Sequence, residues 1–220
     1  MFKVARFEIT HLPLIRKIGK TGKPVIISTG MASIEEIETA IHTARDAGTN
    51  DIIILKCTSQ YPANASDANL QTIADMSERF GVQAGLSDHT LGIGVGIAAI
   101  GYGATVIEKH FTIDRSQGGV DSEFSMEPHE MKMLKEETSR AWHARGKIKY
   151  DGTENEKNSK QFRQSIYPST NISAGDVFSK ENLKICRPGL SLEPSHWNDL
   201  LGKQAKRDIE MGERLKPEDI

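Results

Sequence analysis

The sequence predicts an α/β fold with a parallel sheet, followed by a small, mostly β domain. Three observations lead to this prediction. From Lys23 to about Arg145, short β-branched runs alternate with polar or glycine-containing loops and longer segments of helical spacing. A polar stretch then interrupts this pattern, and beyond it two similar phrases occur among short strand-like pieces and turns. Strands that alternate with helices at this spacing pair in parallel, because each helix returns the chain to the same end of the sheet.

Five strands are expected in the first domain. Each is a short run enriched in valine, isoleucine or other apolar residues, bounded by turn-forming residues. The first run is followed by the helical stretch "LPLIRKIG" and so makes one more βα unit ahead of the other four. The expected strands are "FKVARFE" (2–8), "PVIIS" (24–28), "DIIILK" (51–56), "VQAGL" (82–86) and "ATVIE" (104–108).

Helices are expected after these strands, beginning near Ser33, Ala68, Leu91 and Glu127. Ser33 followed by Glu36 fits a capping box, in which the hydroxyl and the carboxylate each accept a hydrogen bond from a free amide of the first turn. The phrase "GIGVG" (92–96) has the spacing of a dinucleotide-binding loop. It lies inside a helical segment rather than at a strand-to-helix turn, so this signal is weak.

The domain boundaries follow from a change of composition after "RGKIKY". The stretch "DGTENEKNSKQ" (151–161) is polar and is interpreted as a linker. Beyond it, "ISAGDVFSKENL" (172–183) and "IEMGERLKPEDI" (209–220) share one order of apolar residue, glycine turn, acid, apolar residue and lysine-containing helical start. This similarity indicates an internal pseudo-repeat. We therefore expect the α/β domain over 1–148, the linker over 149–163 and the small domain over 164–220.

The composition excludes several classes of protein. The 220 residues carry a formal net charge of -2, and their basic and acidic residues are interspersed, which argues against a nucleic-acid partner. Apolar runs are far shorter than the ~18 residues of a membrane span, and the N-terminus lacks the pattern of a signal peptide. A cytoplasmic protein without a membrane partner is expected. Its two cysteines, Cys57 and Cys186, are expected to be reduced thiols.

Unusual polar residues occur where the strands end. Parallel α/β domains bind ligands at the carboxyl ends of their strands. Because side chains alternate faces along a strand, Ser87 and His89 share one face, and Glu108 and His110 share one face of the next strand. If those faces point into a barrel mouth, the two imidazoles approach each other and could hold a divalent metal, with Glu108 as an orienting group or substrate ligand.

Simpler interpretations exist for the same motifs. The Asp-His-Thr turn at 88–90 could cap the following helix, and a single histidine at a strand end is more often structural than a ligand. The turn "STGM" (28–31) could need Gly30 only for its backbone, or could bind a phosphate with its amides. Cys57 is interpreted as a core residue, because the sequence offers no partner that would activate it.

Several motifs in order resemble the sialic acid synthase family of bacterial enzymes, which condense phosphoenolpyruvate with an amino sugar. They are "GKPVIISTGMAS", "LKCTSQYPA", "GLSDHTLGIG", "GATVIEKHFT" and the "RPG" near the C-terminus. The resemblance covers essentially the whole chain, and the tail resembles the small antifreeze-like domain of that family, also called SAF. Within the family, "KHFTIDRSQGGVDSEFSMEP" is most similar to the pseudaminic acid synthase branch.

The resemblance implies a metal site and catalytic residues. It assigns metal binding to His89 and His110, with Mn²⁺ or Mg²⁺ as the ion. Glu108 and Asp121 are implied to contact the sugar or a water, and Glu8 matches a family carboxylate.

The resemblance also implies substrate contacts and partners. Lys3 and Ser87 are similar to phosphoenolpyruvate contacts, and Ser59 and Tyr61 are counted with the substrate-binding residues. Arg187, in "RPG", is similar to an arginine that the small domain extends into the active site of the other subunit. The implied partners are therefore phosphoenolpyruvate, an acetamido sugar and a second copy in a domain-swapped homodimer.

This chain departs from the family in two respects. A (β/α)8 barrel takes ~250 residues, whereas five βα units are counted here, so we expect a partial barrel without the first three units. Arg6 stands where the family usually has a small residue, and a bulky cation there could clash with a phosphate or add a contact. The expected function is pseudaminic acid synthesis, with little activity from this chain alone; the alternatives are an N-acetylneuraminate or legionaminic acid synthase, or a non-catalytic sugar-binding remnant.

Overall fold

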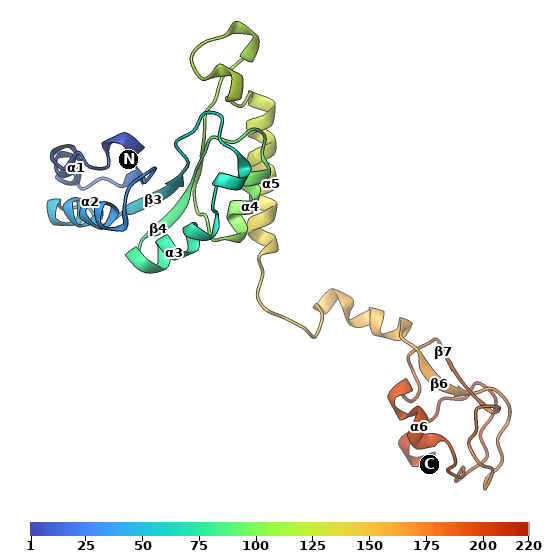
Figure 1. Ribbon diagram of the computed structural model, residues 1–220. Coiled ribbons are helices and arrows are strands. Elements are labelled where there is room, and N and C mark those ends of the chain that lie inside the picture. Colours follow the sequence, from blue (N-terminus) through green and yellow to red (C-terminus); the bar gives the residue numbers. More distant parts are fainter. Residues whose placement is uncertain (220) are drawn as a thin grey trace. The chain divides into compact units, whose positions relative to one another are not determined.

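The computed structural model describes residues 1–219. It divides into two compact parts, residues 1–146 and the residues from 147 onward (Figure 1). The first part contains the parallel sheet and its helices, and the second contains a two-stranded antiparallel sheet.

The five strands expected in the first part are present, and they form one parallel sheet in sequential order. They are β1 (Phe2–Val4), β2 (Val25–Ser28), β3 (Ile52–Cys57), β4 (Gln83–Asp88) and β5 (Ile107–Lys109). Two predicted boundaries were wrong. β1 stops at Val4, because the chain turns into a 3-10 helix, η1 (Arg6–Glu8), that is closed by the Glu8 carboxylate accepting from the Ala5 amide at 3.0 Å. β5 starts three residues later than predicted, although Thr105 already bonds to Ala84 of β4.

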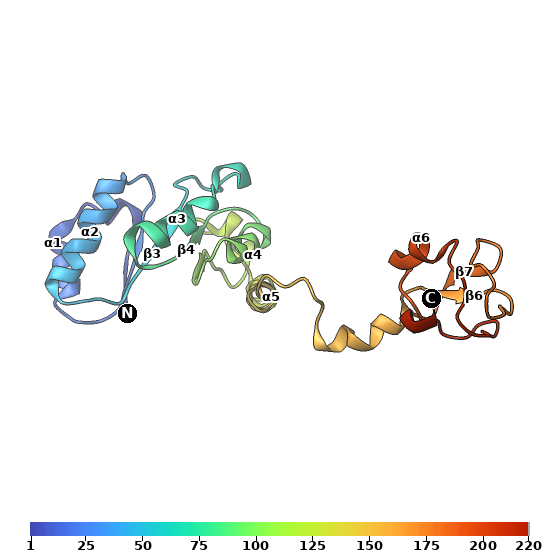
Figure 2. The same ribbon diagram turned by 90° about the horizontal axis from the view of Figure 1, so that it is seen from below.

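The helices of the first part follow the strands as predicted. They are α1 (Leu12–Gly19), α2 (Ile34–Ala47), η2 (Ala65–Asp67), α3 (Gln71–Phe80), α4 (Gly94–Gly101), η3 (Arg115–Gln117), η4 (Ser122–Phe124) and α5 (Pro128–Ala144). Helices α1 and α2 lie side by side in both views, and Figure 2 shows α5 almost end-on (Figures 1 and 2). The predicted capping box of Ser33 and Glu36 is present at the start of α2.

Two helices begin later than predicted for a local reason. Asn69, ahead of α3, and Gly92, ahead of α4, both have positive φ, at 45° and 71°. A left-handed residue cannot continue a right-handed helix, so each helix starts after it. Among the described residues, no helix combines the length and the apolar character needed to cross a membrane.

One hydrophobic core lies between the sheet and its helices. Alternate strand residues such as Val25, Ile27, Ile54 and Leu86 join this core together with Ile41 and other helix residues. The side chains between them point to the opposite face of the sheet. That second face carries the polar residues singled out in the sequence.

The sheet is strongly curved toward this polar face. Lys3 on β1 and Glu108 on β5 belong to the two outermost strands, yet the Lys3 Nζ lies 3.6 Å from the Glu108 Oε2. In a flat sheet of five strands the outer two would be about 19 Å apart, farther than these two side chains can reach together. The curvature is that of a barrel segment, which confirms the partial-barrel prediction.

Gly85 in the middle of β4 is required by close packing. A Cβ at this position would lie 2.3 Å from the carbonyl oxygen of Val106 and 2.8 Å from the Cδ2 of Leu55. We expect Gly85→Ala to lower the free energy of unfolding by about 1–3 kcal/mol, as measured by urea denaturation. Gly94→Ala is the matched control, because a Cβ there meets nothing within 4 Å. Equal effects of the two substitutions would contradict the packing argument.

The second part has its own small core. Its elements are η5 (Glu154–Phe162), β6 (Ser165–Pro168), β7 (Leu183–Cys186), η6 (Pro194–His196), α6 (Trp197–Leu200) and η7 (Pro217–Asp219). Ile166, Phe178, Leu200 and Ile209 are among its buried residues. Within the described residues, β6 and β7 are the strands, and isolated bridges and turns make up much of the remainder, so the regular β content is lower than predicted.

The predicted pseudo-repeat appears as repeated hydrogen bonding. The first residues of the two phrases, Ile172 and Ile209, exchange backbone hydrogen bonds at 2.9 and 2.8 Å. In each phrase the acid then accepts from a backbone amide three residues earlier, at 2.9 Å in both cases, as Asp176 does from Ser173. A second turn follows in each, closed by Asn182 in one and by Asp219 in the other, both at 2.8 Å.

The stretch interpreted as a linker contains a 3-10 helix. η5 runs through most of it, and Thr153 and Glu156 form a capping box at its start. The Thr-x-x-Glu signature is visible in the sequence. η5 buries none of its residues. It therefore lacks the periodic apolar positions by which a helix is predicted from sequence.

Candidate functional site

The carboxyl ends of β4 and β5 bring two predicted site residues into direct contact. Ser87 and Glu108 are paired across the two strands, and the Ser87 hydroxyl donates to the Glu108 Oε1 at 2.7 Å. The other oxygen of Glu108 faces Lys3. Lys3 in turn donates to the Ser28 hydroxyl at the end of β2, at 2.8 Å. The concave face therefore carries a connected polar network at its centre.

The two predicted metal ligands lie beyond this network, one at each strand end. The ring centroids of His89 and His110 are 5.2 Å apart. The Nδ1 of His89 lies 2.9 Å from the carbonyl oxygen of Thr58. A carbonyl oxygen only accepts, so Nδ1 carries the proton and the lone pair is on Nε2. The Nδ1 of His110 lies 3.7 Å from an oxygen of Asp121, which is beyond hydrogen-bond distance.

Burial keeps the His89 imidazole neutral. The pKa of His89 is lowered, mainly because burial penalises the charged ring, and the nearby His110 and Arg6 lower it further. Neutral imidazole is the form that binds a metal. The Nε2 lone pair, the neighbouring second imidazole and the carbonyl oxygen behind Nδ1 together fit a divalent ion.

Aromatic side chains enclose the histidine pair. Tyr61, from the loop after β3, has its ring centroid 4.3 Å from that of His89 and 5.5 Å from that of His110. Phe124 lies 5.1 Å from His110. Phe124 belongs to the long segment 111–126 between β5 and α5, drawn in yellow-green (Figure 1). Backbone hydrogen bonds from the Thr112 amide to Met126 and from the Met126 amide to His110 close the base of this segment.

Asp88, in the same turn as His89, has a structural role. It accepts from the Thr90 amide at 2.9 Å and pairs with the Lys109 ammonium at 3.0 Å. Both charged side chains are almost completely buried, with exposures of 1% for Asp88 and 2% for Lys109. The interpretation of the 88–90 turn as a cap of the following helix was wrong, because Asp88 bonds within its own turn, whereas the N-cap of α4 is Ile93 and has no side-chain cap bond.

Three predicted site residues lie outside this network. The Glu8 carboxylate closes the local turn of η1. The Ser59 hydroxyl is buried without a hydrogen-bond partner among the described residues. Arg187 is exposed and belongs to the second part of the chain.

Sequence reasoning missed three contributors. Ser28 ends β2 inside the "STGM" motif, so a signal for it existed, whereas Thr58 acts through its backbone and Phe124 comes from a loop without a recognisable pattern.

A second group of possible ligands is engaged in ion pairs. Glu127, His129 and Glu130 have ligand atoms within 4.8 Å of one another. Arg115 pairs with both carboxylates, and this contact lowers the pKa of Glu130. This group is therefore interpreted as a salt-bridge network.

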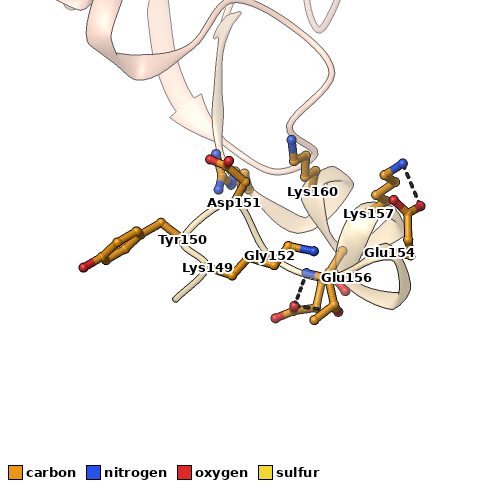
Figure 3. A pocket seen from close by; sticks show the side chains of 11 residues that line it. Lys149, Tyr150, Asp151, Gly152, Glu154, Glu156, Lys157 and Lys160 are labelled. Atoms are coloured by element: carbon orange, nitrogen blue, oxygen red, sulfur yellow. Dashed lines mark hydrogen bonds and ion pairs between the residues drawn. The ribbon is translucent and has the colours of Figure 1, made fainter. Parts of the chain in front are cut away.

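A cavity of about 800 Å³ lies in the second part of the chain and is lined by residues between 149 and 163 (Figure 3). None of the predicted site residues lines it. Three of its charged side chains have local partners, since Lys157 pairs with Glu154 at 2.7 Å and Glu156 bonds to Thr153. Tyr150 points away from the other labelled side chains (Figure 3). These features do not indicate a binding site.

The chain is similar to pseudaminic acid and legionaminic acid synthases. It is 40% identical to the pseudaminic acid synthase of Campylobacter jejuni (strain 81-176) and 37% identical to an N,N'-diacetyllegionaminic acid synthase of the same species. These matches cover 100% and 98% of this chain. The chain spans 64% of the first of these relatives and 66% of the second.

Solved structures show the same relationship. The spore coat polysaccharide biosynthesis protein SpsE of Bacillus subtilis has a TM-score of 0.63 and 31% identity, over 100% of this chain and 67% of that one. The N-acetylneuraminic acid synthetase of Leptospira borgpetersenii has a TM-score of 0.66 and 37% identity, over 71% and 55%. Residues 1–150 match the model of the NeuB family, and residues 163–220 match that of the SAF domain. The chain therefore belongs to the NeuB family of sialic acid synthases and carries a SAF domain.

Proposed function

We propose that the protein condenses phosphoenolpyruvate with a 6-deoxy diacetamido hexose to form pseudaminic acid. The observation that carries this proposal is the histidine pair of the β4 and β5 ends, with ring centroids 5.2 Å apart, beside the network of Lys3, Ser87 and Glu108. The choice of sugar rests on the 40% identity to a pseudaminic acid synthase, against 37% to a legionaminic acid synthase. N-acetylneuraminate and legionaminic acid synthesis are the alternatives.

The reaction needs an electrophile and a site for phosphate. His89 and His110 would hold a Mn²⁺ or Mg²⁺ ion, which supplies Lewis-acid polarisation of an aldehyde oxygen when bound. Lys3 and the Ser28 hydroxyl offer a positive charge and a hydrogen bond to a phosphate group. A carbon–carbon bond forms between the enol methylene and the aldehyde carbon, water adds at the enol carbon, and inorganic phosphate leaves.

Glu108 and Asp121 are the proposed carboxylates for water and sugar. Glu108 is held by Ser87 at 2.7 Å, so it is positioned to accept a proton from a water on the concave face. Asp121 lies beside His110 with a left-handed backbone, which turns its side chain toward the site. Tyr61 and Ser59 are proposed to contact the substrates, and Glu8 is proposed as a further carboxylate. In a domain-swapped homodimer, Arg187 of a second copy would complete the site.

A second proposal concerns the 220 residues by themselves. Both outer strands of the sheet, β1 and β5, have a neighbour on one side only within the described residues. We propose that this chain alone binds metal and substrate but turns over little or no phosphoenolpyruvate. A non-catalytic sugar-binding role remains the alternative function that this geometry favours.

A chimera tests both proposals. The upstream segment of the Campylobacter jejuni synthase that this chain does not match is fused ahead of Met1, and phosphate release from phosphoenolpyruvate is followed with Mn²⁺ and each candidate sugar. The chimera is expected to work at an ordinary enzyme rate of about 1–10³ s⁻¹, and its His89→Asn variant is not. A folded chimera without phosphate release contradicts the synthase proposal. Turnover at such a rate by the 220-residue chain contradicts the second.

A further inference from the structure

The segment 111–126 brings two side chains to the histidine pair without support from the hydrophobic core. Asp121 lies beside His110, and the Phe124 ring packs against the same imidazole. As far as the structure describes it, the core of the first part includes no residue of this segment. The Val120 side chain of the segment is 96% exposed. Polar contacts therefore have the larger share in fixing where Asp121 and Phe124 lie.

Arg115 joins the two ends of this segment. Its guanidinium donates two hydrogen bonds to the carboxylate of Glu130, in the first turn of α5, and lies 3.7 Å from an oxygen of Glu127. The same guanidinium donates to the carbonyl oxygen of Ser125 at 3.1 Å. A two-bond pair within such a network holds its members more firmly than an isolated surface ion pair does. Arg115 thus ties the start of the segment to its end.

Ser125 extends this connection to Asp121. Ser125 is buried, and its hydroxyl donates to the carbonyl oxygen of Asp121 at 2.7 Å. Asp121 has a left-handed backbone, with a φ of 67°. For a residue with a side chain, this conformation costs free energy and persists where the surrounding structure holds it. Phe124 directly precedes Ser125 in the chain, so the same contacts fix its backbone.

The helices on either side of Arg115 are closed by their own residues. At the start of α5, the Glu127 amide donates to the Glu130 carboxylate at 2.8 Å. At the start of η3, the Asp114 carboxylate accepts from the Ser116 amide at 2.8 Å. Neither helix needs Arg115 as a cap. The contacts of Arg115 are therefore best explained by the segment that lies between the two helices.

We propose that Arg115 is a positioning residue, which holds Asp121 and Phe124 at the histidine pair through Ser125. The part that Asp121 and Phe124 play in the condensation rests on the function proposed above. A guanidinium suits this place, because its planar group bonds to a carboxylate and to a carbonyl oxygen at once, which an ammonium on a flexible stem holds less rigidly. Without Arg115 the segment loosens, while the sheet and both histidines keep their places.

Amide hydrogen exchange of the 220-residue chain tests the positioning directly. Arg115→Met is expected to speed exchange of the amides in 117–126 by about 10- to 100-fold, as for loss of a hydrogen bond to a charged group. Ser125→Ala is expected to act in the same direction, and Arg115→Lys to have a smaller effect. Exchange in β2 and β3 is expected to stay as in the wild type.

Arg140→Met is the matched control for this exchange experiment. Arg140 is an exposed arginine of α5 that pairs with Glu137 within its own helix, so its loss is expected to leave exchange in 117–126 unchanged. Unchanged exchange in Arg115→Met overturns the inference. Faster exchange over the whole first part does so too, because Arg115 would then support the fold rather than the segment.

Kinetics of the chimera separate positioning from stability. Arg115→Met is expected to lower kcat by about 10- to 100-fold, the usual cost of a small misplacement, and to leave the KM for phosphoenolpyruvate unchanged, because Lys3 and Ser28 lie outside the segment. Arg115→Lys is expected to recover part of kcat. In an Asp121→Asn background, Arg115→Met is expected to have a much smaller further effect, because Arg115 acts through Asp121. Fully additive effects, or a rise in KM alone, contradict the inference.

The two experiments distinguish this inference from the proposed function. An inactive chimera refutes the function, and the exchange experiment then decides the inference by itself. An active chimera in which Arg115→Met alters neither exchange nor kcat keeps the function and removes the inference.

Discussion

Replacing either His89 or His110 with alanine is expected to weaken Mn²⁺ binding by roughly 100-fold or more. Loss of a group that merely orients a ligand typically costs 10- to 100-fold in metal affinity, and each of these changes removes a ligand itself. The His89 Nδ1 is engaged by the Thr58 carbonyl, so no other nitrogen of that loop can replace its Nε2. Titration of Mn²⁺ followed by electron paramagnetic resonance measures the free ion directly.

His129→Ala is the control for this experiment. His129 belongs to the other group of possible ligands, with Glu127 and Glu130, and it is exposed. Its removal is expected to leave Mn²⁺ binding unchanged, because Arg115 already neutralises the two carboxylates. Loss of Mn²⁺ binding in His129→Ala, together with normal binding in His89→Ala, would contradict the assignment of the metal site to the strand ends.

Lys109→Met is expected to destabilise the first part of the chain by about 3–5 kcal/mol, the usual cost of breaking a buried ion pair from one side. The methionine has nearly the same volume, so the loss comes from Asp88, which is left charged and almost fully buried. The Thr90 carbonyl, which accepts from Lys109 at 2.6 Å, also loses its partner. The shift of the urea midpoint at constant slope measures this cost.

An exposed ion pair provides the comparison. Arg79 donates two hydrogen bonds to Asp75 on the surface of α3, with comparable geometry but in contact with solvent. Arg79→Met is expected to cost no more than about 1 kcal/mol, because water screens such pairs. If the two substitutions prove equally mild, the Asp88–Lys109 pair is not desolvated in solution as it is in the structure.

The sequence predicts which strands form the sheet better than it predicts the residues at which β1 ends and β5 begins. β2 and β3 are β-branched runs, and the strands pair in chain order, so local composition suffices to predict them. At β1 the run "FKVARFE" continues in apolar character past Val4, but the hydrogen bond from Ala5 to Glu8 bends the backbone there. At β5 the ladder depends on where β4 ends, which a local pattern does not contain.

Only those site residues that follow from the alternation of side chains along a strand can be predicted from the sequence. Alternation placed Ser87 and His89 on one face, and Glu108 and His110 on one face of the next strand. The structure brings the two histidines together as expected and also joins Ser87 to Glu108. Contacts made by backbone or by distant loops leave no such trace, as the Thr58 carbonyl shows. The surroundings of Arg6 include Gly30 and Ser59, which come from other loops of the chain, so no local pattern predicts them.

The link between the outermost strands has one more consequence. The ammonium of Lys3 serves both the Ser28 hydroxyl and the second oxygen of Glu108. An anion bound to this ammonium would compete with both of these oxygens for one donor. The contact that joins the first and last strands would then weaken, so that occupancy of the concave face and the spacing of the two sheet edges would be coupled.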